Sequence, residues 1–215
     1  MSSPDDTRDL VVLVPGRNDE AAVRSLLNRP GELGIRPIKF VTHVHSRRDP
    51  GCLRESHSFL SPLSGQFAHA LVMFDRIGSG RESNSAEELE TLVVGQLEAS
   101  GWKGRAGAIV IDPELEAWVW ADSANVDRHL GWSGRSPSLR EWLTSVGQVA
   151  IGQKFVNPTK AVELALRKAR IPRSSSVYAD LAGTVSLRRC QDPAFARFKE
   201  VLQNWFPLDT GPLIR

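Results

Sequence analysis

The feature that most constrains the fold is an uninterrupted apolar run near the N-terminus. Residues 10–14 read LVVLV, and Pro15 and Gly16 follow directly. A strand with one face in water alternates apolar and polar residues, whereas a strand buried on both faces is apolar throughout. Strands of the second kind belong to parallel sheets that helices cover on both sides. We therefore expect an α/β fold.

Further segments alternate between helix and strand patterns. A helix should follow the first run, because Asn18 or Asp19 could cap it and Pro30 predicts its end near Asn28. Residues 85–88, SAEE, have the form of a capping box and open a helix with an apolar stripe. Apolar or β-branched stretches predict three more strands, at residues 35–45, 71–74 and 108–111. This alternation predicts a mainly parallel four-stranded sheet flanked by helices.

The second half of the chain has mostly helical patterns. A capping side chain stands before a proline three times, and a proline suits the first position of a helix; the pairs are Ser136-Pro137, Asn157-Pro158 and Asp192-Pro193. Residues 170–176 are the best candidate for an exposed loop. We expect residues 1–122 to form the α/β core and residues 123–215 a helical C-terminal extension packed on it.

Charge is divided unevenly between these two parts. Residues 1–122 hold 13 Lys and Arg against 18 Asp and Glu, and residues 123–215 hold 14 against 7. An acidic part could hold a metal and a basic part could hold phosphate, although two solvated surfaces would give the same count. Cys52 and Cys190 lack the number and spacing of a disulfide framework or zinc site. No leader or membrane-spanning stretch is evident, so a cytoplasmic location is expected.

An acidic residue comes directly after each of two predicted strands. Asp75 ends the third strand before a Gly-Ser-Gly loop at residues 78–80, and Asp112 ends the fourth. Parallel strands bring their carboxyl ends to one edge of the sheet, where ligands collect. Carboxylate oxygens suit Mg²⁺, which usually takes one or two of them together with water and substrate phosphate. The alternative is that Asp75 only hydrogen-bonds the next loop, as aspartates do at turns.

Glu114 and Glu116 follow Asp112 at the start of a predicted helix that carries Trp118 and Trp120. They could belong to the site, or they could only stabilise the helix start. Asp112 and Glu116 are four residues apart and could share a helix face. The candidates for binding phosphate or nucleic acid are cationic: Arg17, Arg76, Arg47, Arg48, Lys154 and Lys160. The chain contains no phosphate-binding GxxxxGK loop, no nucleophile elbow and no Rossmann glycine fingerprint.

Three segments together carry a resemblance to a known group of proteins. They are VPGRNDE after the first strand, FDRIGSG after the third, and IDPELEAWVWAD after the fourth. Over roughly residues 10–122 the chain resembles the TOPRIM-like families of bacterial defence proteins. Across nearly its whole length it looks most like the small TOPRIM-like component of methylation-associated, that is restriction-modification-associated, defence systems.

The resemblance implies a metal site and also a departure from it. TOPRIM enzymes place a glutamate after the first strand and Asp-x-Asp after the third, and these carboxylates bind Mg²⁺ for phosphoryl transfer. This chain has Pro15 and Ile77 where the glutamate and the second aspartate are expected, so only Asp75 carries over directly. The residues that could complete a degenerate site of metal ligands are Asp19, Glu20, Asp112, Glu114 and Glu116.

The resulting expectation is an accessory or effector component of an antiphage (antiviral) defence system. It would bind Mg²⁺ or Mn²⁺, other proteins of the system, and DNA or RNA; it would need no membrane, and a homodimer is left open. The first alternative is an active Mg²⁺-dependent nuclease, with Asp75, Glu20 and Glu116 in catalytic roles. The second is a non-catalytic scaffold. Whether the protein is an enzyme is therefore left undecided.

Overall fold

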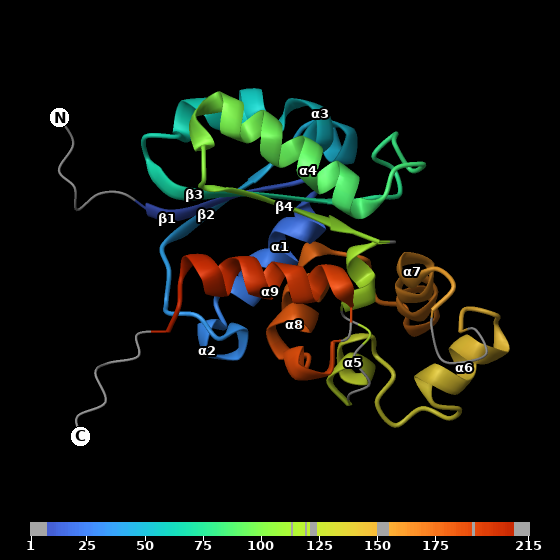
Figure 1. The fold of residues 1–215 in the computed structure, drawn as a ribbon. Coiled ribbons are helices and arrows are strands. Elements are labelled where there is room, and N and C mark those ends of the chain that lie inside the picture. The colour runs from blue at the N-terminus through green and yellow to red at the C-terminus, as the bar shows by residue number, and fades with distance from the viewer. Residues whose placement is uncertain are drawn as a thin grey trace, which may run out of the picture.

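The computed structural model describes residues 8–112, 114–118, 120, 124–149, 155–190 and 192–208. Its centre is a sheet of parallel strands in the order β2-β1-β3-β4 (Figure 1). The strands are β1 (Arg8–Val14), β2 (Phe40–Val44), β3 (Phe67–Asp75) and β4 (Ala106–Ile111). Each neighbouring pair is parallel. The predicted α/β class and four-stranded parallel sheet are confirmed.

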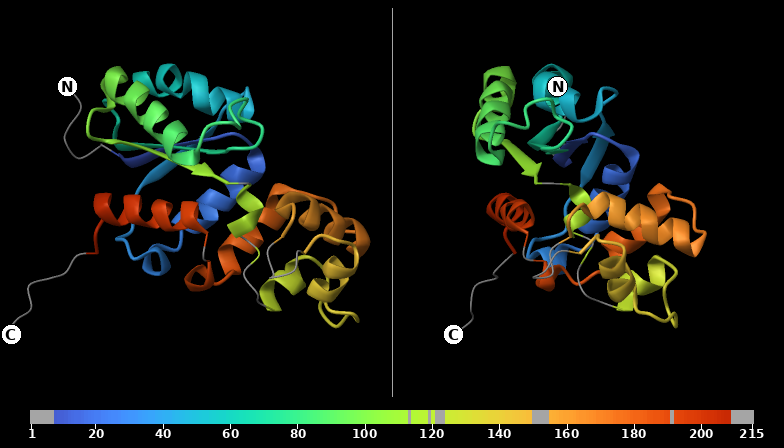
Figure 2. Two further views of the ribbon diagram at one scale, coloured as in Figure 1. Left: turned by 45° about the vertical axis from the view of Figure 1, so that its right-hand side comes forward. Right: turned by 90° about the vertical axis from the view of Figure 1, so that its right-hand side faces the viewer.

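Helices cover both faces of this sheet. The helices are α1 (Arg17–Leu27), α2 (Pro30–Leu33), α3 (Arg48–Leu60), α4 (Ala86–Leu97), α5 (Ala124–His129), α6 (Leu139–Ser145), α7 (Pro158–Ala169), α8 (Ser175–Thr184) and α9 (Pro193–Trp205). Helices α3 and α4 lie on one face, and α1, α8 and α9 lie on the other (Figure 1). Figure 2 shows the remaining C-terminal helices grouped beside the carboxyl ends of the strands. The predicted helical C-terminal part is confirmed.

Two apolar cores result from the alternation of side chains along the strands. Val11, Leu13 and Phe74 face α3 and α4 in one core. Leu10, Val12 and Met73 face the opposite way, into a core that also includes residues of α1, α8 and α9. Because successive residues of a strand point to opposite faces, only an apolar run such as residues 10–14 can serve both cores. Residues from both halves of the chain pack in the second core.

Some predicted helix starts are confirmed and others are wrong. Ser85 and Glu88 form the predicted capping box of α4, and the side chains of Asn157 and Asp192 cap α7 and α9. Ser136 does not start a helix, because α6 begins at Leu139 with Ser138 as its cap. The capping box of Ser138 provides a partner for the first amides of α6 that Ser136 does not.

Other boundaries differ from the sequence-based expectations. Gly16, and neither Asn18 nor Asp19, precedes α1. Helix α8 begins inside the stretch expected to be a loop. The strand predicted at 35–45 is shorter, because Ile35 pairs instead in an antiparallel bridge with Pro207. The helix expected to carry the tryptophans is only a 3₁₀ turn, Leu115–Trp118.

None of the helices in the described ranges is both long and apolar enough to cross a membrane.

Candidate functional site

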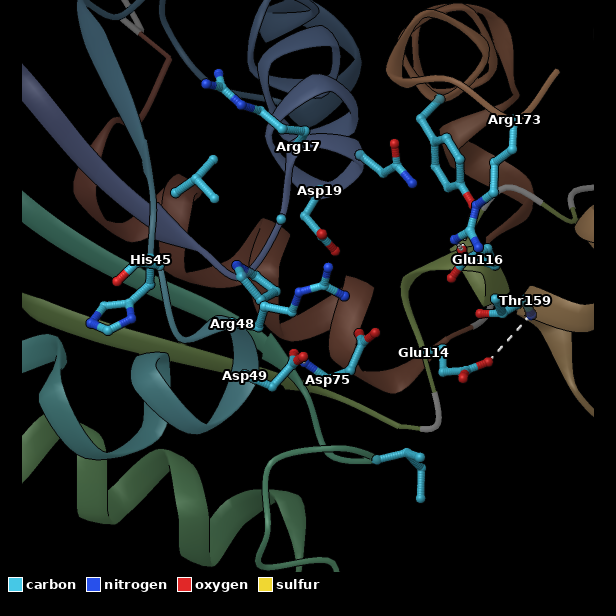
Figure 3. Close-up of a pocket in the computed structure, with 17 residues that line it drawn as sticks. Arg17, Asp19, His45, Arg48, Asp49, Asp75, Glu114, Glu116, Thr159 and Arg173 are labelled. Carbon is cyan, nitrogen blue, oxygen red and sulfur yellow. Dashed lines mark hydrogen bonds and ion pairs between the residues drawn. The ribbon is translucent and has the colours of Figure 1, made fainter.

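A cavity of about 580 Å³ opens beyond the carboxyl ends of β1, β2 and β3. Its walls come from the start of α1, the β2–α3 connection, the end of β3, the segment after β4, and the helices α7 and α8 with the loop between them (Figure 3). In parallel α/β sheets, ligands bind in the crevice outside these strand ends. The volume lies within the usual range of small-molecule sites. We call this cavity the acidic pocket, after the carboxylates described next.

Three aspartates from three separate segments point into the middle of the acidic pocket. Asp19 lies in the first turn of α1, Asp49 in the first turn of α3, and Asp75 at the end of β3. The backbone N–H of Asp75 donates to Oδ1 of Asp49 at 2.9 Å, which fixes these two residues side by side. Oδ1 of Asp75 accepts from the backbone N–H of Leu115 at 3.1 Å. Figure 3 shows all three carboxylates directed toward the same space.

Burial raises the pKa values of these three carboxyl groups, and neighbouring negative charges add to the rise for Asp19 and Asp75. Burial raises the pKa of Asp75 well above its ordinary value, and the charges of Asp19 and Asp49 raise it further. Burial, with the charges of Asp49 and Glu116, raises the pKa of Asp19 from 3.8 to about 7. Burial likewise raises the pKa of Asp49. A buried group near like charges disfavours its ionised form, so a bound cation would relieve the repulsion.

The segment after β4 adds two glutamates to the wall of the acidic pocket. Glu116 is 5% exposed, and its Oε1 accepts from the hydroxyl of Tyr178 at 2.6 Å and from the guanidinium of Arg173 at 3.1 Å. Burial and the Glu116 charge raise the pKa of Tyr178, so its hydroxyl keeps the proton that it donates. Glu114 accepts from the backbone N–H of Thr159, the second residue of α7, at 3.3 Å. The C-terminal helices therefore form part of the pocket.

Two arginines stand at the mouth of the acidic pocket. Arg48 has a φ of 52°, in the left-handed region that non-glycine residues seldom adopt. Its side chain extends over the space between Asp19 and Asp75 in the view of Figure 3. Arg17 points outward, with a side chain that is 82% exposed and an ion pair to Glu20 at 3.2 Å. Backbone strain of this kind is concentrated at functional sites.

The structure brings together some of the site residues that the sequence predicted, but not all of them. Four of the predicted acidic residues line the acidic pocket with two of the predicted arginines: Asp19, Asp75, Glu114, Glu116, Arg17 and Arg48. Glu20 does not line the acidic pocket, and its side chain accepts from the hydroxyl of Thr42 on β2 at 3.0 Å. Asp112 faces a different hollow and pairs with Arg76 at 3.0 Å.

The other predicted cations also lie away from the acidic pocket. Arg47 pairs with Glu55 at 2.6 Å on α3. Lys160 is exposed on α7, where its backbone N–H bonds the cap Asn157. Lys154 lies outside the described residues.

Sequence reasoning missed Asp49, Arg173 and Tyr178. A signal existed for Asp49, because Asp49-Pro50 after a strand resembles the other capping pairs and marks a helix start at the same edge of the sheet. Arg173 and Tyr178 carried no signal, since they are 57 and 62 residues from their partner Glu116. Contacts over such separations depend on how α8 packs against α1.

The carboxylate oxygens of Asp19, Asp49 and Asp75 in the acidic pocket suit a hard divalent cation. Within the described ranges, however, no three His, Cys, Asp or Glu side chains are already arranged to hold a metal ion. Asp49 and Asp75 offer a pair of neighbouring carboxylates. Mg²⁺ is commonly held by one or two carboxylates, with water and substrate phosphate completing its shell. The pocket fits that mode of binding and not a closed metal cage.

Comparison of the chain with protein-family models, with curated proteins and with solved structures gives no match. Its class is therefore described from its fold and its pocket alone. It is an α/β protein with a four-stranded parallel sheet and an acidic pocket at the carboxyl edge of that sheet.

Proposed function

We propose that the acidic pocket binds Mg²⁺ or Mn²⁺ together with a phosphodiester ligand. The observation that carries this proposal is the convergence of Asp19, Asp49 and Asp75, which all have raised pKa values, on one space. Such crowding destabilises the empty pocket and makes cation binding favourable. Asp49 and Asp75 would hold the cation, and Arg48 would contact the phosphate. A bound divalent cation would neutralise phosphate charge and polarise a phosphoryl oxygen.

The wider role that we propose is a TOPRIM-like component of a bacterial antiphage defence system. It rests on the resemblance of the three segments after the strands, and on Asp75 at the position of a TOPRIM metal ligand. Asp49 beside Asp75 would substitute for the carboxylate that Ile77 cannot supply. In that role the protein would bind other proteins of the system and DNA or RNA. The metal site would then differ from that of TOPRIM enzymes in the origin of its second carboxylate.

A second candidate function is hydrolysis of the phosphodiester. The observation that favours it is the pKa of Asp19, which burial raises to about 7. A general base works best when its pKa lies near the working pH. Asp19 could accept a proton from an attacking water molecule, and Tyr178 and Arg173 would hold Glu116 in place beside it. A non-catalytic scaffold remains the rival of both functions.

Thermal unfolding with EDTA, Mg²⁺ or Mn²⁺ tests the cation site. At about 100 times its Kd, a cation stabilises the native state by about 2.7 kcal/mol. For a chain of this size we expect the Tm to rise by about 5–10 °C. The variants Asp75→Asn and Asp49→Asn should lose this rise, because each removes a carboxylate from the pair. Asp112→Asn is the matched control, since Asp112 lies outside the pocket.

Each outcome of this experiment has a clear meaning. A wild-type protein whose Tm ignores both cations would overturn the cation site, and so would an Asp112→Asn variant that loses the shift as completely as Asp75→Asn. Cleavage of a labelled oligonucleotide separates the two candidate functions. If hydrolysis occurs, Asp19→Asn should abolish it while the Tm shift persists in reduced form.

A further inference from the structure

A second hollow, of about 510 Å³, lies between α1 and α8 next to the acidic pocket. Arg17 lines both cavities, so the two adjoin at the start of α1. The residues of the second hollow that belong to α1 or follow it recur at intervals of three or four along one helix face: Arg17, Glu20, Ala21, Arg24, Ser25 and Asn28. Ser175 and Ala179 of α8 form the opposite wall. We call this hollow the α1–α8 groove.

The chemistry of the α1–α8 groove suits a chain of phosphates. Arg17 and Arg24 are both exposed, and Ser25, Asn28 and Ser175 add uncharged hydrogen-bonding groups. Ala21 and Ala179 have small side chains that fill little of the groove, so a ligand backbone could approach α1 and α8 closely. Arginine binds phosphate through two parallel N–H donors.

Glu20 is the acidic residue among the described residues that line the groove, and it is paired with Arg17. The side chain of Glu20 is only 17% exposed. Its Oε1 accepts from the hydroxyl of Thr42 at 3.0 Å, and its Oε2 pairs with Arg17 at 3.2 Å. Arg24 donates to the same hydroxyl through Nη1 at 3.3 Å, which directs this end of its guanidinium toward β2. A network of this kind holds both arginines in place for a ligand.

We propose that the α1–α8 groove binds the sugar-phosphate backbone of a polynucleotide whose one phosphate occupies the acidic pocket. This inference rests on the proposed function, because it takes the pocket as the place where the reactive or recognised phosphate lies. From residue 17 to residue 28 the helix extends about 16 Å at about 1.5 Å per residue. That length equals the axial rise of roughly five nucleotides of one duplex strand, at about 3.4 Å of helix axis each. The ligand is therefore a strand of several nucleotides, and not a mononucleotide.

Fluorescence anisotropy with labelled 12-nucleotide strands tests the groove. For duplex DNA, each phosphate contact contributes a slope of about −0.9 in the logarithm of affinity against that of salt, and for a single strand about −0.7. Between 50 and 200 mM salt, wild-type affinity for the duplex should therefore fall about 3.5-fold more than that of Arg24→Gln, and about 12-fold more than that of Arg17→Gln/Arg24→Gln. For the single strand the corresponding factors are about 2.6 and about 7. Lys103→Gln is the matched control, because Lys103 is an exposed cation just before β4, at the opposite edge of the sheet. It should behave as wild type.

Further measurements identify the ligand and exclude misfolding of the variants as the cause of lost binding. DNA and RNA strands of one sequence, single and paired, show which backbone is preferred, and a labelled dinucleotide should be insensitive to Arg24→Gln. Equal effects of Arg24→Gln and Lys103→Gln would overturn the groove, as would absent binding of every strand or equally good competition by poly-glutamate. The Tm shift with Mn²⁺ should be unchanged in Arg24→Gln. A missing shift in wild type would reject the cation site, whereas the anisotropy data alone decide the groove.

Discussion

Replacing Asp19 with asparagine should stabilise the metal-free protein at neutral and alkaline pH. Asn has nearly the shape of Asp but carries no charge, so the change removes the cost of burying a charge, and the repulsion from Asp49 and Glu116, without leaving a cavity. The pKa of Asp19 rises from 3.8 to about 7 in the folded protein. At about 1.4 kcal/mol per pH unit, ionised Asp19 would cost at most about 4 kcal/mol. Water that reaches the open pocket lowers this cost, and we expect about 1–2 kcal/mol.

The stability gained by Asp19→Asn should depend on pH. The folded protein holds the Asp19 proton more tightly than the unfolded chain does. This proton therefore stabilises the fold fully below the unfolded pKa, and the stabilisation is lost as pH rises through the folded pKa, which is about 7. The advantage of Asp19→Asn should be small near pH 4 and grow until about pH 7. It should be constant above that pH.

Urea unfolding in EDTA at a series of pH values measures the effect. The free energy of unfolding follows from linear extrapolation, and a gain of about 1–2 kcal/mol would raise the Tm by about 2–8 °C. Asp180→Asn serves as control, because Asp180 is an exposed aspartate of α8 outside the acidic pocket. A variant less stable than wild type at pH 8, or a difference between the two that is the same at pH 4 and pH 8, would refute the proposed electrostatic crowding.

Two further predictions concern residues that shape the acidic pocket. Gly16→Ala would place a Cβ 2.7 Å from Oδ2 of Asp19 and displace that carboxylate. We expect the affinity for Mn²⁺, measured from the Tm shift, to fall at least about threefold, while the metal-free stability changes by less than about 1 kcal/mol. Full retention of the Mn²⁺ affinity would contradict the proposed place of Asp19. Tyr178→Phe removes the 2.6 Å hydrogen bond to Glu116 but leaves that of Arg173, so urea unfolding should show a loss of about 1–2 kcal/mol. An unchanged free energy of unfolding would show that Arg173 alone satisfies the carboxylate.

The sequence was sufficient to predict the sheet and its carboxyl edge. Apolar runs long enough to be buried on both faces identify β1, β3 and β4, and parallel pairing then places Asp75 beside the start of α1. Asp19 follows from the same reasoning. These features depend on local periodicity and on one topological rule, and both can be recognised in the order of the residues.

Helix α3, which carries Asp49, was missed although the pair Asp49-Pro50 lies in its first turn. Its first residues, Arg-Asp-Pro-Gly, have the composition of a turn. Pro50 is tolerated because it lies in the first helical turn. Gly51 is required by tertiary packing, since a Cβ there would lie 1.9 Å from Nδ1 of His45. A glycine that permits a close contact with the residue that follows β2 looks, in the sequence, like a glycine that breaks a helix.

The partners of Glu116 also could not be predicted from the sequence. Arg173 and Tyr178 reach it only because α8 packs along α1 and closes one side of the cavity. No periodicity connects residues so far apart. Their role depends on tertiary structure alone, and the stretch from 170 to 176 therefore looked like an ordinary exposed loop.

The clamp of Tyr178 and Arg173 on Glu116 also has a consequence for synthesis. Chains emerge from the ribosome in order, and folding begins before translation ends. The aspartates of α1, α3 and β3 therefore leave the ribosome well before the residues that close the wall behind Glu116. A nascent chain that ends before α8 would expose Glu116 without its two donors. Completion of the wall should thus follow the emergence of α8, after the aspartates of α1, α3 and β3 have emerged.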